Sequence, residues 1–303
     1  MKDIYRNKSL VRFCRLFGIT RQAYYKHFWQ WEAVSIEHEI ILRRVKEIRR
    51  YHPVLGGRKL YALLQPDLLH HQIKIGRDGL FNLLAEHALL VRRKRRRAIT
   101  THSNHWYRKY PNLIKELVPA SANELWVSDI TYWRTPFGFL YISFITDAYS
   151  HKIIGYHLAN NLEAINNVKA LQMALKTLNK PVQELIHHSD RGIQYCSAEY
   201  VNLLQDFKIK ISMTESGDPL ENPVAERING IIKEEYLKHK DIQNQMKALE
   251  VLQQSVQLYN NERPHLSNNF LTPKQAHQLT GKLNKQWKNY YHKKTAPVNL
   301  LQD

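Results

Sequence analysis

The spacing of hydrophobic and polar positions changes near residue 124. Upstream, apolar residues recur every three or four positions, which predicts helices. Downstream, three short apolar runs follow one another closely and predict strands at 124–133, 137–149 and 151–159. A helix at 162–179, a strand at 184–190, a helix near 197–205, a strand at 209–213 and a helix from about 223 complete the pattern. Three consecutive strands and then alternating helices and strands predict an α/β fold with a mixed sheet flanked by helices.

The first helical segment, residues 9–28, reads as two helices around a turn at Gly18, with Ser9 and Thr20 as helix-capping residues. This is the layout of a helix-turn-helix, and Arg21 and Gln22 would lie near the start of the helix that faces DNA. A plain helical hairpin is the alternative.

A second helical region is expected at 35–50 and another at 75–97, which ends in six consecutive basic residues. These are Arg92, Arg93, Lys94, Arg95, Arg96 and Arg97. Such a run binds phosphates when they are present, and helices before it favour a second DNA-binding module. We therefore divide the chain into a helix-turn-helix-like segment (1–33), a helical DNA-binding domain (34–97), a linker (98–120), the α/β core (121–280) and a basic tail (281–303).

The charge supports this division. The chain of 303 residues has a net charge of +18. Residues 1–118 hold 25 Lys and Arg against 9 Asp and Glu, whereas residues 119–280 hold 15 against 17. The excess of positive charge therefore belongs to the helical region, which indicates a nucleic acid as the binding partner rather than evenly scattered solvated lysines.

Other protein classes are excluded by what the sequence lacks. The longest apolar run, FLYISFI at 139–145, is too short to span a bilayer, and no signal peptide is expected after the basic N-terminus. Two cysteines, Cys14 and Cys196, provide neither a disulfide framework nor a zinc site. We expect a reduced, cytoplasmic protein.

Three carboxylates stand out in the core. Asp129 lies within the first strand and Asp190 at the end of the fourth, where a charge is costly unless a cation neutralises it. Asn222 and Pro223 start a helix, which presents Glu226 and Lys233 on the side opposite its apolar stripe. Two aspartates and a glutamate supply only oxygen ligands, which suits two Mg²⁺ or Mn²⁺ ions roughly 3.5–4 Å apart.

Thirty-five residues separate Asp190 from Glu226, and Lys233 follows Glu226 by seven positions. Together with WVSDITY, HSDRGIQY, SMTESGDPLENPVAERINGIIKEE and YNNERPHLSNNFLTPKQA, this spacing resembles the DDE signature of OrfB-type transposases of bacterial insertion sequences. The resemblance covers residues 124–276 closely and residues 36–97 loosely. It implies an RNase H-like integrase catalytic core, with Asp129, Asp190 and Glu226 as the catalytic and metal-binding triad.

The resemblance also implies DNA contacts. Lys233 matches the basic residue that contacts the DNA end, and further matching positions are Gln194, Tyr195, Asn222, Arg263 and His265. It implies metal-dependent cleavage and joining of element ends by oligomers on paired double-stranded ends, in a bacterial cytoplasm. An upstream-frame protein, OrfA, separate or fused, is an expected partner, and this chain would be the unfused second frame.

Several alternatives remain open at the level of sequence. Asp147 is a rival third acid, although a turn-forming role is favoured, and His187 and His188 are candidate metal ligands for which packing roles are favoured. Glu234 and Glu235 read as solvated. A catalytically silent DNA-binding regulator and a junction-resolving nuclease of related fold are the competing functions. The intact acids speak against the first and the separate N-terminal helices against the second.

Overall fold

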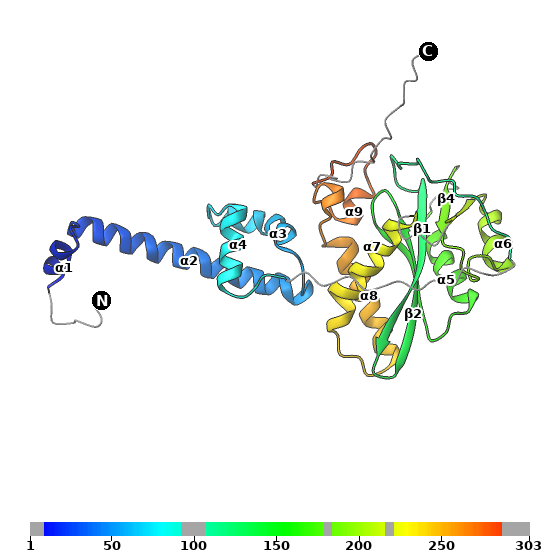
Figure 1. Cartoon of the computed structure of the whole chain (residues 1–303), viewed down its shortest axis with the longest axis horizontal. Coiled ribbons are helices and arrows are strands. Elements are labelled where there is room, and N and C mark those ends of the chain that lie inside the picture. Colours follow the sequence, from blue (N-terminus) through cyan, green and yellow to red (C-terminus); the bar gives the residue numbers. More distant parts are fainter. Residues whose placement is uncertain (1–8, 92–106, 179–183, 216–220, 287–303) are drawn as a thin grey trace, which may run out of the picture. The chain divides into compact units, whose positions relative to one another are not determined.

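The computed structural model describes residues 9–91, 107–178, 184–215 and 221–286. Contacts divide the chain into two units, one made of Met1–Tyr51 and Leu55–Arg92 and the other of His52–Val54 and Arg93–Asp303 (Figure 1). Each unit has a hydrophobic core of its own. The helical region and the α/β core are therefore two separate structural units.

The first unit contains α1 (Leu10–Leu16), α2 (Arg21–Tyr51), α3 (Gly57–His70) and α4 (Arg77–Glu86). Gly18 has a φ of 64° at the turn between α1 and α2, a backbone conformation that glycine adopts without steric cost. Aliphatic side chains of α2, α3 and α4, among them Ile41, Leu64 and Leu80, form the core of this unit.

One prediction for this region is wrong. The second helix of the expected helix-turn-helix and the helical region at 35–50 are a single helix, α2, and the boundary at residues 33 and 34 falls inside it. The reason is the absence of a helix breaker, since no glycine or proline occurs between Gly18 and Pro53.

The core sheet contains β1 (Leu125–Thr135), β2 (Gly138–Asp147), β3 (Ile153–Ala159), β4 (Ile186–Ser189) and β5 (Lys210–Met213). Their order across the sheet is β3-β2-β1-β4-β5. The first three strands are joined in antiparallel pairs, and β4 is parallel to both β1 and β5. The predicted mixed sheet is confirmed.

The helices cover both faces of this sheet (Figure 1). Helices α5 (Ala164–Leu175) and α6 (Ala198–Asp206) share one hydrophobic cluster with Trp126, Ile145 and Ile154. On the other face α7 (Pro223–Ile231), a π-helical turn η2 (Ile232–Tyr236), a 3₁₀ turn η3 (Leu237–His239) and α8 (Gln245–Asn261) pack on Trp133, Leu140 and Ile142. Because successive side chains of a strand point to opposite faces, β1 contributes to both clusters and to the site between them.

The last described segment of the chain packs beside the turn after β2. A 3₁₀ turn, η4 (Leu266–Asn268), precedes the short helix α9 (Pro273–Ala276), in which Thr272 and Gln275 form a capping box. An isolated β-bridge between Ser121 and Thr280 then joins this segment to the start of the core. The sequence from 259 to 276 is thus part of the core domain.

Gly155 provides a direct test of the packing between β3 and α5. A Cβ atom placed there would lie 2.3 Å from the carbonyl oxygen of Ala170 and 2.9 Å from the Cβ of Ala174. Gly155→Ala is expected to destabilise the protein by about 1–3 kcal/mol, because the helix must move away from the strand. Thermal unfolding followed by circular dichroism measures this.

Gly230→Ala is the matched control. No heavy atom lies within 4 Å of a Cβ at this position in α7, so alanine is expected to be neutral or slightly stabilising there. Equal unfolding temperatures for wild type and Gly155→Ala would contradict the close approach of helix and strand.

Candidate active site

Asp129 and Asp190 are brought to the same place by the pairing of β1 with β4. In this parallel pair Val127 lies opposite His188. Continuing the register by two residues sets Asp190, the first residue after β4, opposite Asp129 on the same face of the sheet. Sixty residues separate the two aspartates in the sequence. The placement of β4 beside β1 in the sheet brings them to the same edge.

Glu226 reaches this face from α7. The side-chain amide of Asn222 donates a hydrogen bond to the carbonyl oxygen of Ser128 (3.0 Å), and that of Asn229 donates to Oδ2 of Asp129 (2.8 Å). Glu226 lies four residues after the first and three before the second, so it shares their side of the helix. These two amides therefore fix the helix that carries Glu226 against the strand that carries Asp129.

The electrostatics of Asp129 link the three carboxylates. Burial raises the pKa of Asp129 to about 7, and the charges of Asp190 and Glu226 act in the same direction. The N–H of Ile130 and the amide of Asn229 donate hydrogen bonds to the carboxylate and partly oppose this rise. Three like charges in range of one another constitute a site that a cation would stabilise.

The set of donors is suitable for a hard divalent cation, since all three groups are carboxylates. Within the described ranges no group of three or more His, Cys, Asp or Glu lies close enough to hold one metal ion together. Mg²⁺ does not require such a cage, because it commonly uses one or two carboxylates and completes its shell with water and substrate phosphates. The residues present fit this mode of binding.

Lys233 lies in the π-helical turn η2 rather than in a continued α-helix. Its Nζ is 4.1 Å from the centre of the Tyr132 ring, a cation–π contact. Burial lowers the pKa of Lys233, whereas the charges of Glu234 and Asp129 oppose that shift. The lysine is therefore within electrostatic range of Asp129, and its ammonium lies over an aromatic ring that sequence reasoning did not identify.

The turn after Asp190 is held by that residue's own carboxylate, since the N–H of Gly192 donates to its Oδ1 (2.9 Å). Gln194 is partly exposed and donates to the carbonyl oxygen of Leu162. Tyr195 is buried, with Ser128 donating to its hydroxyl oxygen (3.0 Å). Asn222 is also buried and, although it is at the cap position of α7, its side chain does not cap the helix. Of these predicted DNA contacts, Tyr195 and Asn222 thus face the protein interior.

Arg263 and His265 are inside the domain. The guanidinium of Arg263 is fully buried and donates two hydrogen bonds to Glu235, from Nε to Oε2 (2.8 Å) and from Nη2 to Oε1 (2.7 Å). His265 contacts Arg263 Nη1 at 3.0 Å. Here both side chains stabilise η2, and neither is placed to reach DNA. The expectation that Glu235 is solvated is wrong, because Arg263 binds it.

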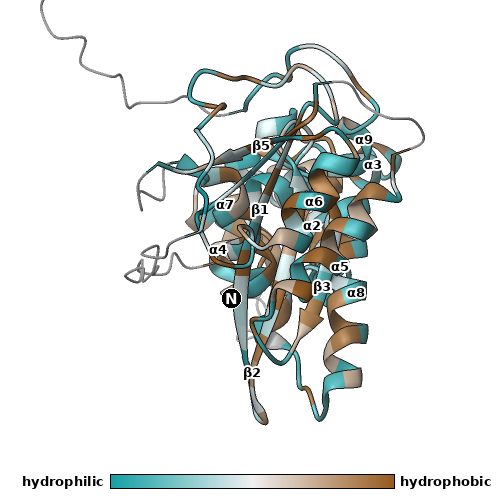
Figure 2. Cartoon of the chain, turned by 90° about the vertical axis from the view of Figure 1, so that its right-hand side faces the viewer, coloured by the Kyte–Doolittle hydropathy of each residue, from teal (hydrophilic) through white to brown (hydrophobic). Residues whose placement is uncertain are grey.

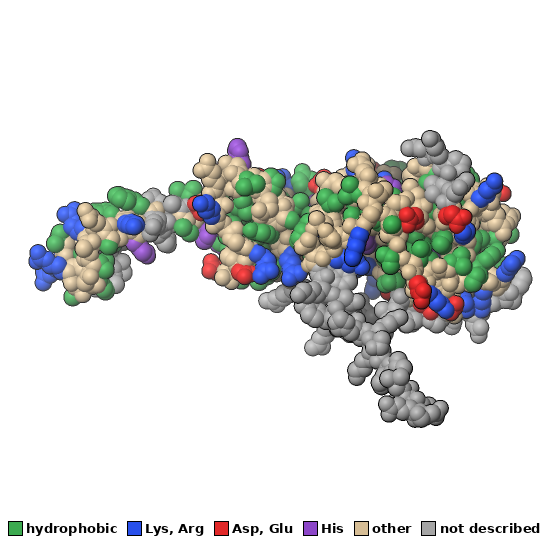
Figure 3. Space-filling model, turned by 90° about the horizontal axis from the view of Figure 1, so that it is seen from above, with side chains coloured by type: hydrophobic (Ala, Val, Ile, Leu, Met, Phe, Trp, Pro, Cys, Tyr) green, Lys and Arg blue, Asp and Glu red, His purple; other side chains and the backbone are tan. Residues whose placement is uncertain are grey.

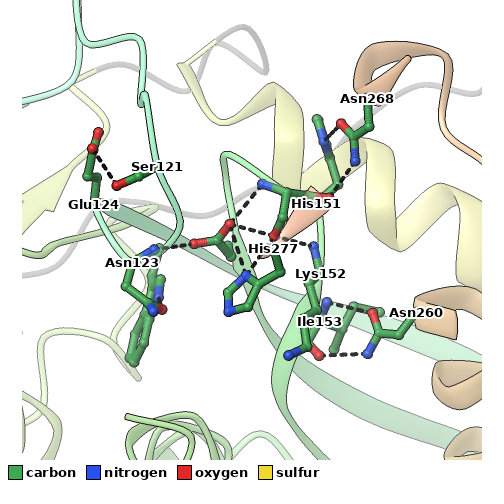
Figure 4. Close-up of polar contacts among 12 residues, drawn as sticks. Ser121, Asn123, Glu124, His151, Lys152, Ile153, Asn260, Asn268 and His277 are labelled. Atoms are coloured by element: carbon green, nitrogen blue, oxygen red, sulfur yellow. Dashed lines mark hydrogen bonds and ion pairs between the residues drawn. The ribbon is translucent and has the colours of Figure 1, made fainter. Parts of the chain in front are cut away.

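Asp147 is a structural acid and not a third member of the site. It is fully buried and accepts hydrogen bonds from the N–H of Asn123 (2.7 Å) and from the N–H and hydroxyl of Ser150 (2.8 and 2.6 Å). His277 lies 3.6 Å away, and Asn268 donates to the carbonyl oxygen of Ser150 (Figure 4). The favoured turn-forming role is confirmed.

The two adjacent histidines also have internal partners. His187 Nε2 lies 2.9 Å from the Tyr200 hydroxyl, and His188 Nδ1 lies 2.8 Å from the Ser212 hydroxyl. Burial lowers the pKa of His187 to about 3 and that of His188 to about 4, so both are neutral at physiological pH. They pack and bond within the sheet, as favoured from the sequence.

Two functional side chains were missed by sequence reasoning. Asn229 and Tyr132 each lie three residues from a predicted site residue, Glu226 and Asp129 respectively. For Asn229 the signal was its place on the same side of α7 as Glu226. For Tyr132 it was an aromatic residue on the exposed face of β1.

The remaining predicted DNA contacts are in the helical unit. Arg21 and Gln22 are exposed at the start of α2. Between residues 9 and 29 the sequence has basic side chains, among them Arg12, Arg15 and Lys26, and no acidic one. Blue side chains are visible at the left end of this unit in Figure 3. The basic run from Arg92 to Arg97 lies outside the described residues. No helix in the described part of the chain is both long and apolar enough to be a membrane span.

Comparison with known proteins agrees with this architecture. Two family models, each described as an integrase core domain, match residues 119–219 and 207–273. The chain is 34% identical over 256 residues to the insertion element IS600 uncharacterized 31 kDa protein of Shigella sonnei, covering 83% of this chain and 92% of that protein. It is 31% identical over 222 residues to the transposase for insertion sequence element IS629 of Shigella sonnei, covering 72% and 73%.

Solved structures similar to the chain include two from viruses. One is the HTLV-2 integrase catalytic core domain in complex with magnesium, with a TM-score of 0.43, 18% identity, and coverage of 53% of this chain and all of that one. Another is the simian T-cell lymphotropic virus intasome in complex with PP2A regulatory subunit B56 gamma, with a TM-score of 0.46, 16% identity, and coverage of 78% and 79%. On the sequence matches, the chain belongs to the family of insertion-sequence transposases with an integrase core domain.

Proposed function

We propose that this transposase cleaves the DNA ends of its insertion sequence and joins them to target DNA by metal-dependent phosphoryl transfer. The observation that supports the proposal is that β1 and β4 pair in parallel as far as Val127 and His188, two residues before Asp129 and Asp190, and that the charges of Asp190 and Glu226 help to raise the pKa of Asp129. Like charges close together at the end of a core sheet destabilise the fold. A reaction that depends on a bound cation explains why the carboxylates are there.

Asp129, Asp190 and Glu226 are the residues that would hold Mg²⁺ or Mn²⁺, two ions by analogy with other phosphoryl-transfer sites. Such ions would supply activation of the attacking oxygen and stabilisation of the leaving oxygen in an in-line displacement. The protein's own contribution is positional. Asn229 orients Asp129 through a 2.8 Å hydrogen bond, and Asn222 fixes the first turn of α7 on β1.

Lys233 would contact a phosphate near the reacting bond, because its ammonium lies beside the carboxylates and its stem is half-buried. Exposed Arg21 and Gln22, with the basic run from Arg92 to Arg97, would bind the terminal repeats. The active form would be a homo-oligomer on paired ends, working with an upstream-frame protein.

Metal binding can be tested without any activity assay. Mg²⁺ or Mn²⁺ is expected to raise the unfolding temperature of the wild-type protein, since a ligand at 100 times its Kd stabilises the native state by about 2.7 kcal/mol. Asp129→Asn should reduce this increase, because it removes one of the three carboxylates and its negative charge from the site. Differential scanning fluorimetry with increasing metal concentration measures both.

Asp206→Asn is the control, because Asp206 is an exposed acid at the end of α6. It should keep the metal-dependent increase in full. If Asp129→Asn responds to the metal as the wild type does, Asp129 is not a ligand.

The proposed reaction is tested in cells. The gene and its native flanking DNA are placed on a plasmid, beside copies with Asp190→Asn or Glu226→Gln, and excised or circular element DNA is measured. We expect product from the wild type alone. Equal product from the substituted copies would contradict the triad.

If no copy yields product, the upstream reading frame is supplied from a second plasmid. Product that then appears for the wild type alone supports the proposal. Continued absence, with DNA binding retained, favours a silent regulator.

A further inference from the structure

The hairpin formed by β1 and β2 carries an unusual exposed face. In the antiparallel register Tyr132 lies opposite Tyr141, and Arg134 lies opposite Phe139. Residues opposite one another in such a pair project on the same side of the sheet, so three aromatic rings and a guanidinium share one surface. This end of the hairpin extends beyond the other strands of the sheet (Figures 1 and 2).

The two sides of the hairpin differ sharply in burial. Trp133, Leu140 and Ile142 on one side belong to the hydrophobic cluster beneath η2 and α8. On the other side Tyr132 is 58% exposed and Phe139 is 52% exposed, although their rings contact each other edge to face at 5.9 Å. Aromatic side chains of this size are mostly buried in folded proteins, so a pair left in solvent needs an explanation.

Lys233 links the exposed face to the candidate active site. Tyr132 follows Asp129 by three residues, about 10 Å along the strand, so the two side chains leave opposite faces of β1. In the described part of the sheet, β4 pairs with β1 only from Leu125 to Val127, so the edge of β1 beside Tyr132 is not covered by that strand. Lys233, which acts electrostatically on Asp129, lies over the Tyr132 ring. Lys233 thus contacts the aromatic face and is also within electrostatic range of Asp129.

The charge of this face points to the chemistry of its partner. From Ile130 to Ser143 the sequence contains Arg134 and no acidic residue. Exposed aromatic rings next to arginine and lysine match what a nucleic-acid strand offers, namely flat bases for stacking and phosphates for the cations. Bases of an intact duplex are already stacked on each other, so only unpaired bases can stack on protein rings.

We propose that Tyr132 and Phe139 form a stacking surface for unpaired bases of DNA next to the reacting phosphate, with Lys233 and Arg134 contacting the adjoining backbone. The proposal rests on the proposed function, since it assigns the melted strand to the same site. A second copy of the chain is a less suitable partner, because the same basic residues would face one another across a symmetric contact.

The experiment measures binding to a single strand and to a duplex separately. All proteins carry Glu226→Gln, which prevents cleavage, and the protein with no further substitution is the reference. Each is titrated with oligothymidine and with a fully paired duplex. Tyr132→Ala is expected to weaken binding of the single strand by ~10-fold, the loss of one base–aromatic stack, and to change duplex binding little. Tyr132→Phe should retain binding, because it keeps the ring.

Two further substitutions make the result specific. Phe139→Ala should also weaken single-strand binding, and it leaves the Tyr132 ring beneath Lys233 in place. Its effect can be measured even if Tyr132→Ala does not fold. Phe207→Ala removes an exposed ring beyond α6 and should have no effect. A fluorescent aminopurine base placed in the single strand should lose fluorescence when the reference protein binds, because the base stacks on a ring. With Tyr132→Ala this loss should be smaller.

Three results would overturn the proposal. Equal weakening of single-strand and duplex binding would mean that Tyr132 acts only by holding Lys233. An effect no larger than that of Phe207→Ala would mean that the rings do not contact DNA. A changed oligomeric state with unchanged DNA binding would make this face a contact between copies. This binding assay does not depend on cleavage, so the two proposals can fail separately. If Tyr132 stacks bases in this assay but the wild-type protein never joins DNA ends, only the proposed function is refuted.

Discussion

Glu226→Gln is expected to lower the rate of DNA-end cleavage and joining by roughly 10³-fold or more while leaving DNA binding intact. Such a loss corresponds to about 4 kcal/mol of transition-state stabilisation, which is the scale for removing one preorganised electrostatic partner. The substitution keeps the size and hydrogen-bonding shape of the side chain and removes only its charge. Glu226 is exposed at the first turn of α7, so the fold should tolerate it. The measurement uses purified protein, end duplexes and Mg²⁺, with products separated on a denaturing gel.

Glu199→Gln is the matched control. Glu199 is an exposed acid in the first turn of α6, as Glu226 is in the first turn of α7. Its neutralisation should change the rate less than twofold, because it removes one exposed charge outside the proposed site. The two variants have the same net charge, so general electrostatic effects on DNA binding cancel between them. Similar rates for the two variants would remove Glu226 from the active site.

Arg263→Met is expected to destabilise the core by about 3–5 kcal/mol, because it removes a fully buried guanidinium and leaves the partly buried Glu235 carboxylate without its partner. Both hydrogen bonds of the guanidinium to Glu235 would be lost, together with its contact to His265. Glu235 belongs to η2, as does Lys233, so the variant should also lose end joining at temperatures where it is still folded. Thermal unfolding should shift downward by roughly 10 °C for a core of this size.

The exposed pair of Lys247 and Glu250 on α8 is the control, since it has a contact of similar length, 2.8 Å, at the surface. Lys247→Met should cost less than about 0.5 kcal/mol. Combining Arg263→Met with Glu235→Leu should recover part of the stability, because no charge then remains buried. If Arg263→Met is no worse than Lys247→Met, the buried pair does not hold η2 in place.

Much of the core could be predicted from the sequence alone. The period of two in ELWVSDITYW, the apolar runs after it and the Asn222–Pro223 helix start led to β1, β2, β3 and α7 within a few residues. Local patterns of this kind determine which face of an element is apolar, and therefore the class of fold. The spacing of Asp190, Glu226 and Lys233 also indicated the family. Where a local signal was missing, as along the uninterrupted α2, the expected boundary was wrong.

Other features depended on the tertiary structure. Arg263, His265 and Tyr195 looked like DNA contacts because they are polar residues in family motifs. The partners of Arg263 and Tyr195, which are Glu235 and Ser128, lie far away in the sequence, and His265 in turn contacts Arg263. The insertion of β4 beside β1, which brings Asp190 to Asp129, is a choice among strand orders that no local pattern encodes. The same holds for Lys233 over Tyr132. The sequence by itself determined the elements and the acids, whereas burial and long-range pairing decided which polar side chains form the site and which support it, because the free energy of a polar group depends on its surroundings in space.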